Sequence, residues 1–213
     1  MIKEFENLLK EVDERNQMNN IYTEIGTILD NYLDDEFEIS ELADAPVMAV
    51  IEKDGYVSWS GDVTEQQALY VLEQYEFKEL LPAIDGVDVS ILGYVVGREF
   101  FVFSVFQAGE EHEMLPERRA NFMEFFNANL IGVKLRHVPV FPQVLKFDGA
   151  KRALQNNSKR EDVEKYTIKA VVELTNGISP MTKTQRKGLV LKSLTSNYAV
   201  KVYSEQTMQF GSL

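Results

Sequence analysis

Short apolar runs joined by turn residues recur along this chain and predict β-hairpins. The runs are rich in Val, Ile, Leu, Phe and Tyr, which suit a pleated surface with at least one buried face. Asp54-Gly55 separates two of the runs, and a Thr-Ser-Asn segment separates another two. The predicted strand pairs lie in residues 47–60, in 87–96 with 99–106, and in 188–194 with 198–204.

Apolar residues at helical spacing predict helices before and between the hairpins. Thr64, with Gln67 three residues later, has the pattern of a capping box, in which side chain and backbone bond each other at a helix start. Ser158 with Glu161 has the same pattern. The predicted helices are residues 2–33 with a break near 16–20, 64–81, 116–129, 147–156 and 158–177.

The helix predicted over residues 116–129 carries three phenylalanines at helical spacing. We expect Phe122, Phe125 and Phe126 to pack inward. Hairpins with helices between them predict an α+β fold, in which antiparallel β-sheets are flanked by helices. The predicted division is a helical acidic N-terminal region, residues 1–45, followed by one domain, residues 46–213.

Composition limits the class of protein. The 213 residues are 45% hydrophobic and 26% charged, as in ordinary globular domains. No apolar run has the length of a membrane span, and the acidic, amphipathic start of the chain does not resemble a secretion signal. The absence of cysteine excludes disulfides and zinc–thiolate sites. We therefore expect a cytoplasmic protein without a membrane partner.

Charge is distributed unevenly along the chain. Residues 1–115 hold 26 acidic and 6 basic residues, a net charge of −20, whereas residues 116–213 hold 8 acidic and 16 basic residues, a net charge of +8. Together these give the overall charge of −12. A basic C-terminal half indicates a surface for phosphate or a polyanion, and the acidic half is a candidate site for a basic protein partner. Alternatively, the two halves neutralise each other inside the fold.

Two lysines interrupt the apolar strands predicted near the C-terminus. Lys192 lies in residues 188–194 and Lys201 lies in residues 198–204. A lysine within such a strand must reach solvent along its stem or point into a polar cleft. Two of them on adjacent strands would form a small site for an anionic ligand. Alternatively, they are edge-strand lysines that discourage aggregation.

These strands carry a family resemblance. The segments KGLVLKS and AVKVYS, residues 187–193 and 199–204, are similar to the last two signature motifs of ATP-dependent RNA ligases, which are covalent nucleotidyltransferases. LGYVVG and FFVFSV, residues 92–97 and 100–105, resemble two earlier segments of that family, and HVPV, residues 137–140, resembles a connector. The motifs occur in the family's order over residues 90–210. The resemblance implies a nucleotidyltransferase fold.

The resemblance also assigns roles to single residues. It implies that Lys192 and Lys201 hold the nucleotide's α-phosphate and that Phe101 stacks on adenine. The family's nucleophilic lysine lies in a K-x-D-G motif that follows a strand and is often preceded by Glu. Here Glu52-Lys53-Asp54-Gly55 lacks the spacer residue. Because losing one residue from a strand turns the next side chains to the opposite face, Lys53 belongs either to a plain hairpin turn or to a shifted motif.

Two carboxylates of the family pattern are replaced. Tyr94 follows Gly93 where the resemblance calls for Glu, and Lys187 precedes Gly188 where it also calls for Glu. A neutral tyrosine can hydrogen-bond a ribose but is no ligand for Mg²⁺. The ammonium of Lys187 repels the ion but can partly mimic it toward a bound phosphate, so Lys187 and Tyr94 are also candidate nucleotide-binding residues. With Lys53 out of register, three catalytic positions are altered. Each such loss commonly costs a few kcal/mol of transition-state stabilisation, so we expect negligible ligation.

Three functional hypotheses follow. The favoured one is an RNA- or nucleotide-binding protein with a degenerate RNA-ligase-like fold. By analogy it is encoded by a phage and acts in the host cytoplasm. The second is an active, divergent ligase or adenylyltransferase that uses Lys53 with ATP and Mg²⁺. The third is an interaction protein whose acidic N-terminal half binds a basic partner. The favoured hypothesis expects six side chains to line one cleft: Lys53, Tyr94, Phe101, Lys187, Lys192 and Lys201.

Overall fold

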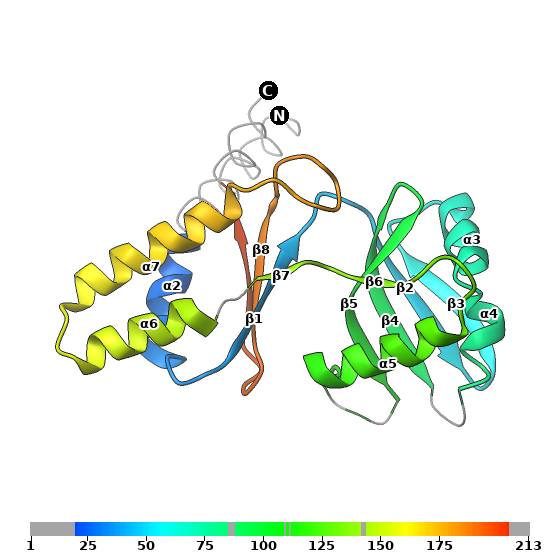
Figure 1. The fold of residues 1–213 in the computed structure, drawn as a ribbon, viewed down its shortest axis with the longest axis horizontal. Helices are drawn as coiled ribbons and strands as arrows, with labels where there is room; N and C mark the ends of the chain where they lie inside the picture. The colour runs from blue at the N-terminus through cyan, green and yellow to red at the C-terminus, as the bar shows by residue number, and fades with distance from the viewer. Residues whose placement is uncertain (1–19, 85–87, 109, 111, 142–143, 205–213) are drawn as a thin grey trace, which may run out of the picture. The chain divides into compact units, whose positions relative to one another are not determined.

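The chain folds into two compact units. The computed structural model describes residues 20–84, 88–108, 110, 112–141 and 144–204. Unit 1 comprises Met1–Asp44 and Pro139–Leu213, and unit 2 comprises Ala45–Val138. Unit 2 is therefore inserted between the two segments of unit 1 (Figure 1).

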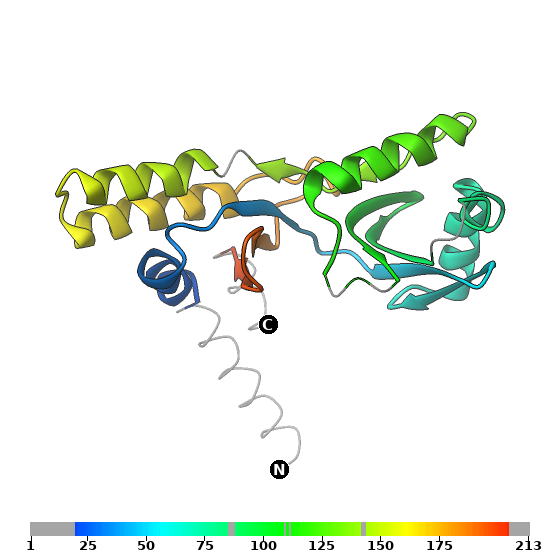
Figure 2. The same cartoon turned by 90° about the horizontal axis from the view of Figure 1, so that it is seen from below.

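Unit 1 is a four-stranded sheet with helices on one face. The antiparallel strands have the order β7-β1-β8-β9, and α2, α6 and α7 pack together on one side of the sheet (Figures 1 and 2). The elements are α2 (Asn20–Asn31), β1 (Phe37–Leu42), β7 (Val140–Phe141), α6 (Val144–Gln155), α7 (Arg160–Thr175), β8 (Gly188–Ser193) and β9 (Ala199–Tyr203).

The core of unit 1 lies between this sheet and its helices. Alternate strand residues point to the helices, and in β1, β8 and β9 they are apolar except for Glu41 and Ser193. They meet apolar residues at helical spacing in α2 and α7. The fully buried members include Ile25, Ile28, Ile39, Val171, Leu189, Leu191 and Val202.

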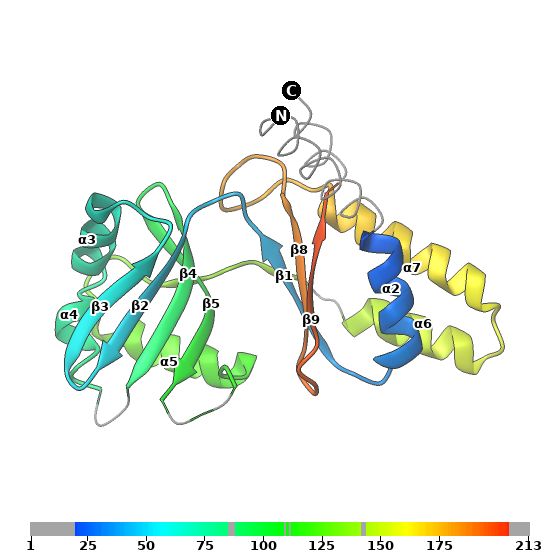
Figure 3. The same ribbon diagram turned by 180° about the vertical axis from the view of Figure 1, so that it is seen from behind.

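Unit 2 is a five-stranded sheet with its own helix layer. The strand order is β3-β2-β4-β5-β6, and every neighbouring pair is antiparallel except β5 with β6. Figure 1 labels all five strands, and Figure 3 shows β3, β2, β4 and β5 from behind. The elements are β2 (Val47–Lys53), β3 (Tyr56–Gly61), α3 (Glu65–Gln74), α4 (Phe77–Leu80), β4 (Val89–Val96), β5 (Glu99–Gln107), α5 (Pro116–Asn129) and β6 (Arg136–His137).

An aromatic cluster forms the centre of the core of unit 2. The ring of Phe77 lies 5.8 Å from that of Tyr75, 6.0 Å from that of Phe100 and 5.3 Å from that of Phe126. These rings connect α3, α4 and α5 to one face of the sheet. The Tyr75 hydroxyl accepts a hydrogen bond from the Phe100 backbone N–H, which satisfies its polar end inside the core.

Most predicted elements are confirmed. The three strand pairs form hairpins or adjacent antiparallel strands, and α5 has the predicted bounds. The capping box at Thr64 is present, with Thr64 accepting from the Gln67 N–H and Gln67 accepting from the Thr64 N–H. The α+β class with antiparallel sheets and flanking helices is also confirmed.

Other expectations about local structure are wrong. Ser158 does not cap α7, whose N-cap residue is Lys159 without a side-chain cap bond. Phe125 does not pack inward, because its side chain lies at the edge of the helix layer and is 59% exposed. The helix predicted over residues 64–81 divides into α3 and α4, since Glu76 adopts a left-handed conformation with φ 49°.

The acidic N-terminal segment also differs from the prediction. Residues 37–42 are not helical but form β1, a fully buried strand between β7 and β8. Residues 20–44 consequently group with 139–204 rather than forming a separate region before residue 46. The helix predicted over residues 2–19 lies outside the described residues.

Candidate functional site

The sheet of unit 1 has one face that turns away from its helices. Residues paired directly across antiparallel strands lie on the same face. Ile39 pairs with Leu191, and both face the helices. The neighbouring pairs, Glu38 with Lys192 and Val190 with Lys201, are shifted by one residue along their strands and so face the other way. Lys192 and Lys201 therefore both lie on the face that α2, α6 and α7 leave uncovered. We call this the lysine face.

The two lysines are diagonal neighbours on adjacent strands. Lys192 pairs with Ala199, two residues before Lys201, so their β-carbons are roughly 7 Å apart. The Lys192 Nζ lies 3.8 Å from a carboxylate oxygen of Glu38, whose side chain is only 4% exposed. The Lys201 side chain is exposed. The lysine face thus holds two cations and one buried carboxylate.

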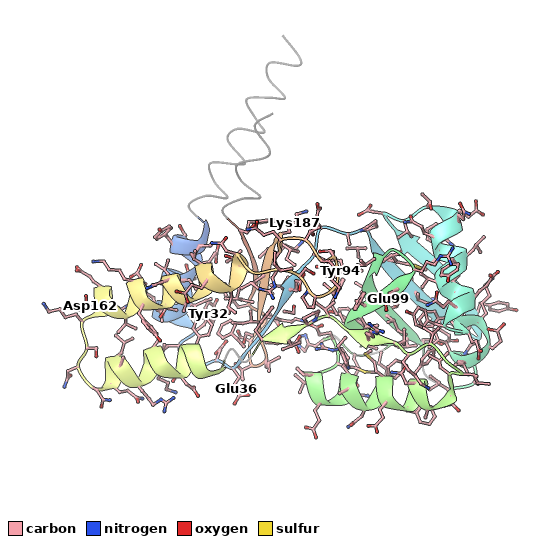
Figure 4. The ribbon with its side chains drawn as sticks, turned by 45° about the horizontal axis from the view of Figure 1, so that its top comes forward. Tyr32, Glu36, Tyr94, Glu99, Asp162 and Lys187 are labelled. Atoms are coloured by element: carbon pink, nitrogen blue, oxygen red, sulfur yellow. The ribbon has the colours of Figure 1, made fainter. Side chains whose placement is uncertain are left out.

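Lys187 lies at the start of the strand that carries Lys192, and it is labelled in Figure 4. It comes directly before β8, and its backbone oxygen accepts from the Ser204 N–H, which extends the ladder between β8 and β9. Its Nζ lies 3.7 Å from a carboxylate oxygen of Asp44. Because Asp44 is exposed, this ion pair contributes little to stability.

A second charged pair is buried on the helix side of the same sheet. Glu41 is 1% exposed, and one of its oxygens lies 3.5 Å from the Nε of Arg186. Burial raises the pKa of the Glu41 carboxyl, and the positive charge of Arg186 opposes that shift. Arg186 also donates to the Leu174 carbonyl at 2.7 Å and stacks over the ring of Phe141 at 4.5 Å. This arginine therefore connects the end of α7 to β1 and β7.

Ion pairs in unit 1 join the acidic and basic parts of the sequence. Five of them connect a carboxylate of residues 20–44 to a cation of residues 139–204. They are Asp30 with Arg160, Asp34 with Lys151, Glu38 with Lys192, Glu41 with Arg186, and Asp44 with Lys187. Much of the basic charge of the C-terminal half is thus balanced inside unit 1, as the neutralisation alternative predicts.

The sheet of unit 2 also has a face turned away from its helices. Tyr94 pairs with Val47 on one side and with Phe101 on the other, so these three residues share that face. Val95 and Phe100, one position away in each strand, face the helix layer instead. The ring of Tyr94 lies 5.0 Å from that of Phe103. We call this the aromatic face; Tyr94 is labelled in Figure 4.

Lys53 lies at the far end of the aromatic face. It alternates with Val47 along β2 and so points to the same side of the sheet as Tyr94. It is, however, six residues beyond Val47, which is about 20 Å along a strand. The next two residues, Asp54 and Gly55, have φ of 53° and 82° and form a tight two-residue hairpin turn. The structure therefore brings Tyr94 and Phe101 together but keeps Lys53 away from them.

A second segment matches the spacing of the K-x-D-G motif better than Lys53 does. Glu41-Leu42-Ala43-Asp44 begins with the last two residues of β1. It has the Glu, the spacer and the Asp in place, with Leu42 where the motif has lysine and Ala45 where it has glycine. Leu42 pairs with Gly188 on the lysine face. Because it has no lysine, this segment was not among the sequence-based predictions. The spacing of its two carboxylates was the signal that could have found it.

Magnesium was the cofactor expected of an active enzyme. The described residues contain no group of three His, Asp or Glu side chains placed to hold a metal ion. Mg²⁺ binds best where carboxylates and other oxygen ligands converge. Mg²⁺ is, however, commonly held by one or two carboxylates together with the phosphates of a bound nucleotide, and such a site does not need three protein side chains.

Comparison with known proteins is informative only at the level of structure. No family model and no curated protein sequence matches the chain. Solved structures of an RNA ligase from Naegleria gruberi do match. A mutant with AMP and manganese has a TM-score of 0.65 and 16% identity over 89% of this chain and 55% of the ligase. A mutant with ATP and manganese has a TM-score of 0.63 and 17% identity over 85% and 53%.

The chain has an RNA ligase-like nucleotidyltransferase fold. A third match, the same ligase with pyrophosphate, has a TM-score of 0.61 and 18% identity over 83% of this chain and 51% of that one. The chain thus spans about half the length of the RNA ligase that it matches. None of the helices in the described ranges has the length and apolar character needed to cross a bilayer.

Proposed function

We propose that this protein binds the phosphate groups of a nucleotide or of RNA and does not ligate. The observation that carries the proposal is the pair of lysines on the lysine face. Lys192 and Lys201 project from adjacent strands to the same side of one sheet, away from its helices. Two ammonium groups at this spacing suit a phosphate, which accepts several charge-assisted hydrogen bonds.

The ion pair of Lys192 is compatible with this role. An ammonium group has three donors, so it can keep one carboxylate contact and still donate to a phosphate oxygen. Glu38 holds the Lys192 side chain in one place, which lowers the conformational entropy that binding would otherwise cost. The matching RNA ligase was solved with AMP, ATP and pyrophosphate, and these ligands support a nucleotide as the bound species.

Two positions support the absence of ligation. Lys53 ends β2 and leads into the tight Asp54-Gly55 turn, about 20 Å along the strand from Val47, the partner of Tyr94, so it lacks the spacing and the position of the K-x-D-G lysine. Leu42, where the better-spaced motif has lysine, carries no amine and cannot form a bond to phosphorus. Tyr94 and Lys187 add two positions without a carboxylate.

Binding is tested with the full chain, using labelled ATP and labelled single-stranded RNA across a salt series. We expect affinity to fall with salt, and Lys201→Ala to weaken binding about tenfold and to reduce the salt slope by about 1. Lys165→Ala is the matched control, because Lys165 is an exposed lysine of unit 1 on α7. Binding that ignores salt, or that Lys165→Ala weakens equally, would sink the proposal.

Lys192 needs a paired design, since removing it takes one cation away from the buried Glu38. Lys192→Met combined with Glu38→Gln removes both charges. We expect this double variant to fold and to bind ATP or RNA about tenfold more weakly, whereas Glu38→Gln alone keeps the affinity or increases it. Unchanged affinity in the double variant would count against a phosphate site on the lysine face.

The active-ligase alternative is tested by incubation with radiolabelled ATP and Mg²⁺. The proposal expects no covalent AMP adduct. An adduct that disappears in Lys53→Ala would replace the proposal with a working, divergent ligase. An adduct that persists in Lys53→Ala would place the nucleophile at another lysine.

The interaction-protein alternative rests on the acidic excess of unit 2. Residues 45–138 contain 15 acidic and 7 basic residues. If neither ATP nor RNA binds, a basic protein partner becomes the leading function. Phage origin and a host-cytoplasmic location stay predictions, made by analogy with phage-encoded ligases.

A further inference from the structure

The lysine face also carries an aromatic side chain, in line with Lys201. Tyr203 follows Lys201 by two residues in β9, so both side chains point to the same side of that strand. Val202, which lies between them, belongs to the core under the helices. Tyr203 therefore shares the lysine face. Its β-carbon is about 7 Å from that of Lys201 along the strand.

The strand position opposite Tyr203 has no side chain. Tyr203 pairs with Gly188 across β8 and β9. A β-carbon at Gly188 would come within 2.1 Å of the Val202 carbonyl oxygen, so the close approach of β9 excludes a larger residue there. Tyr203 itself is half-buried. The flank of its ring toward β8 thus faces no directly paired side chain, which suits the approach of a flat group.

Exposure on the lysine face rises from β1 to β9. On β1, Glu38 is 3% exposed and Ser40 is 6% exposed. Lys192 on β8 is half-buried, and Lys201 on β9 is exposed. In the part of the chain that the structure describes, β9 is an edge strand of its sheet (Figure 3). A ligand that reaches both lysines therefore lies along this edge, where a polymer can continue in both directions.

The charge of the lysine face matches a single phosphodiester. Among the described strand residues that register places on this face, only Glu38, Lys192 and Lys201 are charged, which gives a net charge of +1. A phosphodiester brings one negative charge. A nucleoside triphosphate brings several, and the face alone does not balance them. The chain as a whole, at −12, repels such a ligand further.

We propose that β9 binds a single-stranded polynucleotide, with one phosphodiester against Lys192 and Lys201 and the neighbouring base stacked on Tyr203. This inference rests on the proposed function and specifies its ligand as a polynucleotide backbone rather than free ATP. Cations beside an aromatic ring bind single strands with little sequence preference, because every base has a flat face. RNA and DNA share both groups, so the test includes both.

The test measures binding to the full chain by fluorescence anisotropy without Mg²⁺. The probes are a short labelled oligoadenylate RNA, its DNA counterpart, and an oligomer of the same length whose sugars carry no bases. We expect the oligomer without bases to bind about tenfold more weakly than the oligoadenylate, since it cannot stack. The same series with Mg²⁺ should give no tighter binding of the oligoadenylate.

Competition compares one phosphodiester with a triphosphate. Unlabelled adenylyl-adenosine, which contains a single phosphodiester, and unlabelled ATP are each titrated against the bound oligoadenylate. We expect adenylyl-adenosine to displace it at a lower concentration than ATP does, because its charge matches that of the lysine face.

Variants of Tyr203 separate stacking from support of the strand. Tyr203→Ala should weaken oligoadenylate binding about tenfold and leave the affinity for the oligomer without bases unchanged, whereas Tyr203→Phe should keep both affinities. Tyr166→Ala is the control, because Tyr166 is an aromatic residue of α7 that is 70% exposed. In the unsubstituted chain, the ring NMR signals of Tyr203 should shift with the oligoadenylate and not with the oligomer without bases.

The outcomes distinguish this inference from the proposed function. If neither ATP nor any oligomer binds, or if Lys201→Ala changes no affinity, the proposed function fails and this inference fails with it. If Lys201→Ala weakens binding but Tyr203→Ala affects both oligomers equally, or if ATP displaces the oligoadenylate better than adenylyl-adenosine does, phosphate binding stands and the polynucleotide site is overturned. Equal binding of RNA and DNA, or tighter binding of either, agrees with the inference and names the ligand.

Discussion

The two sheets of this protein share one architecture and differ in what they hold on their faces. Each sheet packs one face against helices and turns the other away from them. In unit 1, carboxylates and cations lie on both faces of the sheet, as Glu38 with Lys192 and as Glu41 with Arg186. In unit 2, the corresponding positions are mainly aromatic or aliphatic, with Tyr94 and Phe101 opposite each other. One fold thus accommodates a charged sheet and an apolar sheet.

This difference indicates which interactions stabilise each unit. The core of unit 2 comes from one continuous segment of chain, and its aromatic cluster needs no charge compensation. Unit 1 assembles two segments separated by unit 2, and its buried charges are compensated across that separation. We therefore expect unit 2 to respond to lost volume, and unit 1 to respond to lost charge and to pH.

The largest expected effect is in the aromatic core of unit 2. Phe77→Ala removes a fully buried ring that contacts three others, and it should lower the free energy of unfolding by about 3–5 kcal/mol. Trp59, the only tryptophan, packs against this core, so its fluorescence during urea unfolding reports on unit 2. Phe125→Ala is the control and should change the free energy by less than about 0.5 kcal/mol. A small loss in Phe77→Ala would contradict the account.

The next largest effect is in the charged sheet of unit 1. Arg186→Met leaves the Glu41 carboxylate buried without its cation and should cost about 3 kcal/mol of unfolding free energy. Hydrogen exchange in peptides of unit 1 measures this loss. Lys187→Met, which removes a cation from the exposed Asp44, should cost less than about 1 kcal/mol.

A double variant sharpens this result. Arg186→Met with Glu41→Leu removes both buried charges, and it should recover much of the stability lost in Arg186→Met. Equal destabilisation of the single and double variants would mean that Arg186 acts through its contacts with Leu174 and Phe141 instead.

A smaller effect concerns pH and Glu41. Burial raises the pKa of Glu41 above 4.5, so the folded state holds this proton more tightly than the unfolded state does. The contribution of Glu41 is therefore greatest below pH 4.5 and is lost as pH rises through the folded pKa. Glu41→Gln should make the decline in unfolding free energy above pH 4.5 shallower. Urea unfolding over a pH series measures the slope, with Glu161→Gln on α7 as the control; identical slopes would refute the role of burial.

The smallest effect has the opposite sign. The hydroxyls of Ser193 and Ser196 donate to Asp35 at 2.6 Å each and lower its pKa below 3.8. The stability from Asp35 is present above pH 3.8 and is lost as pH falls through the folded pKa. Asp35→Asn should lower the free energy of unfolding by about 0.5 kcal/mol near neutral pH. It should also reduce the loss of unfolding free energy as the pH falls below 3.8. Asp162→Asn on α7 is the control, and an unchanged loss at low pH in Asp35→Asn would speak against this bonding.

Parts of the fold and of the site could be predicted because their signals are local. The hairpin of Lys192 and Lys201 follows from two apolar runs around a polar turn, and the Thr64 cap needs only a residue three positions away. By contrast, β1 was not predicted as a strand. Its alternation places Glu38 and Glu41 among apolar residues, and the cations that allow their burial lie about 150 positions later in the chain.

Two site expectations show the same limit. The position of Lys53 depends on how β2 pairs with β4, and its own neighbours in sequence do not reveal that it lies far from Tyr94. Phe125 follows the helical spacing of Phe122 and Phe126, so the spacing predicted burial for all three. Only the orientation of α5 on the core, which buries Phe126 and partly buries Phe122, left Phe125 exposed.

The sequence by itself determined the hairpins, the Thr64 cap and the approximate places of most helices, because turn conformations, capping bonds and residue periodicity each involve only a few neighbouring residues. It also determined that two lysines would occupy adjacent strands. The tertiary structure alone decided that those lysines turn away from the helices and which carboxylates compensate which cations. These features depend on strand register and on contacts between distant segments, which no local pattern encodes.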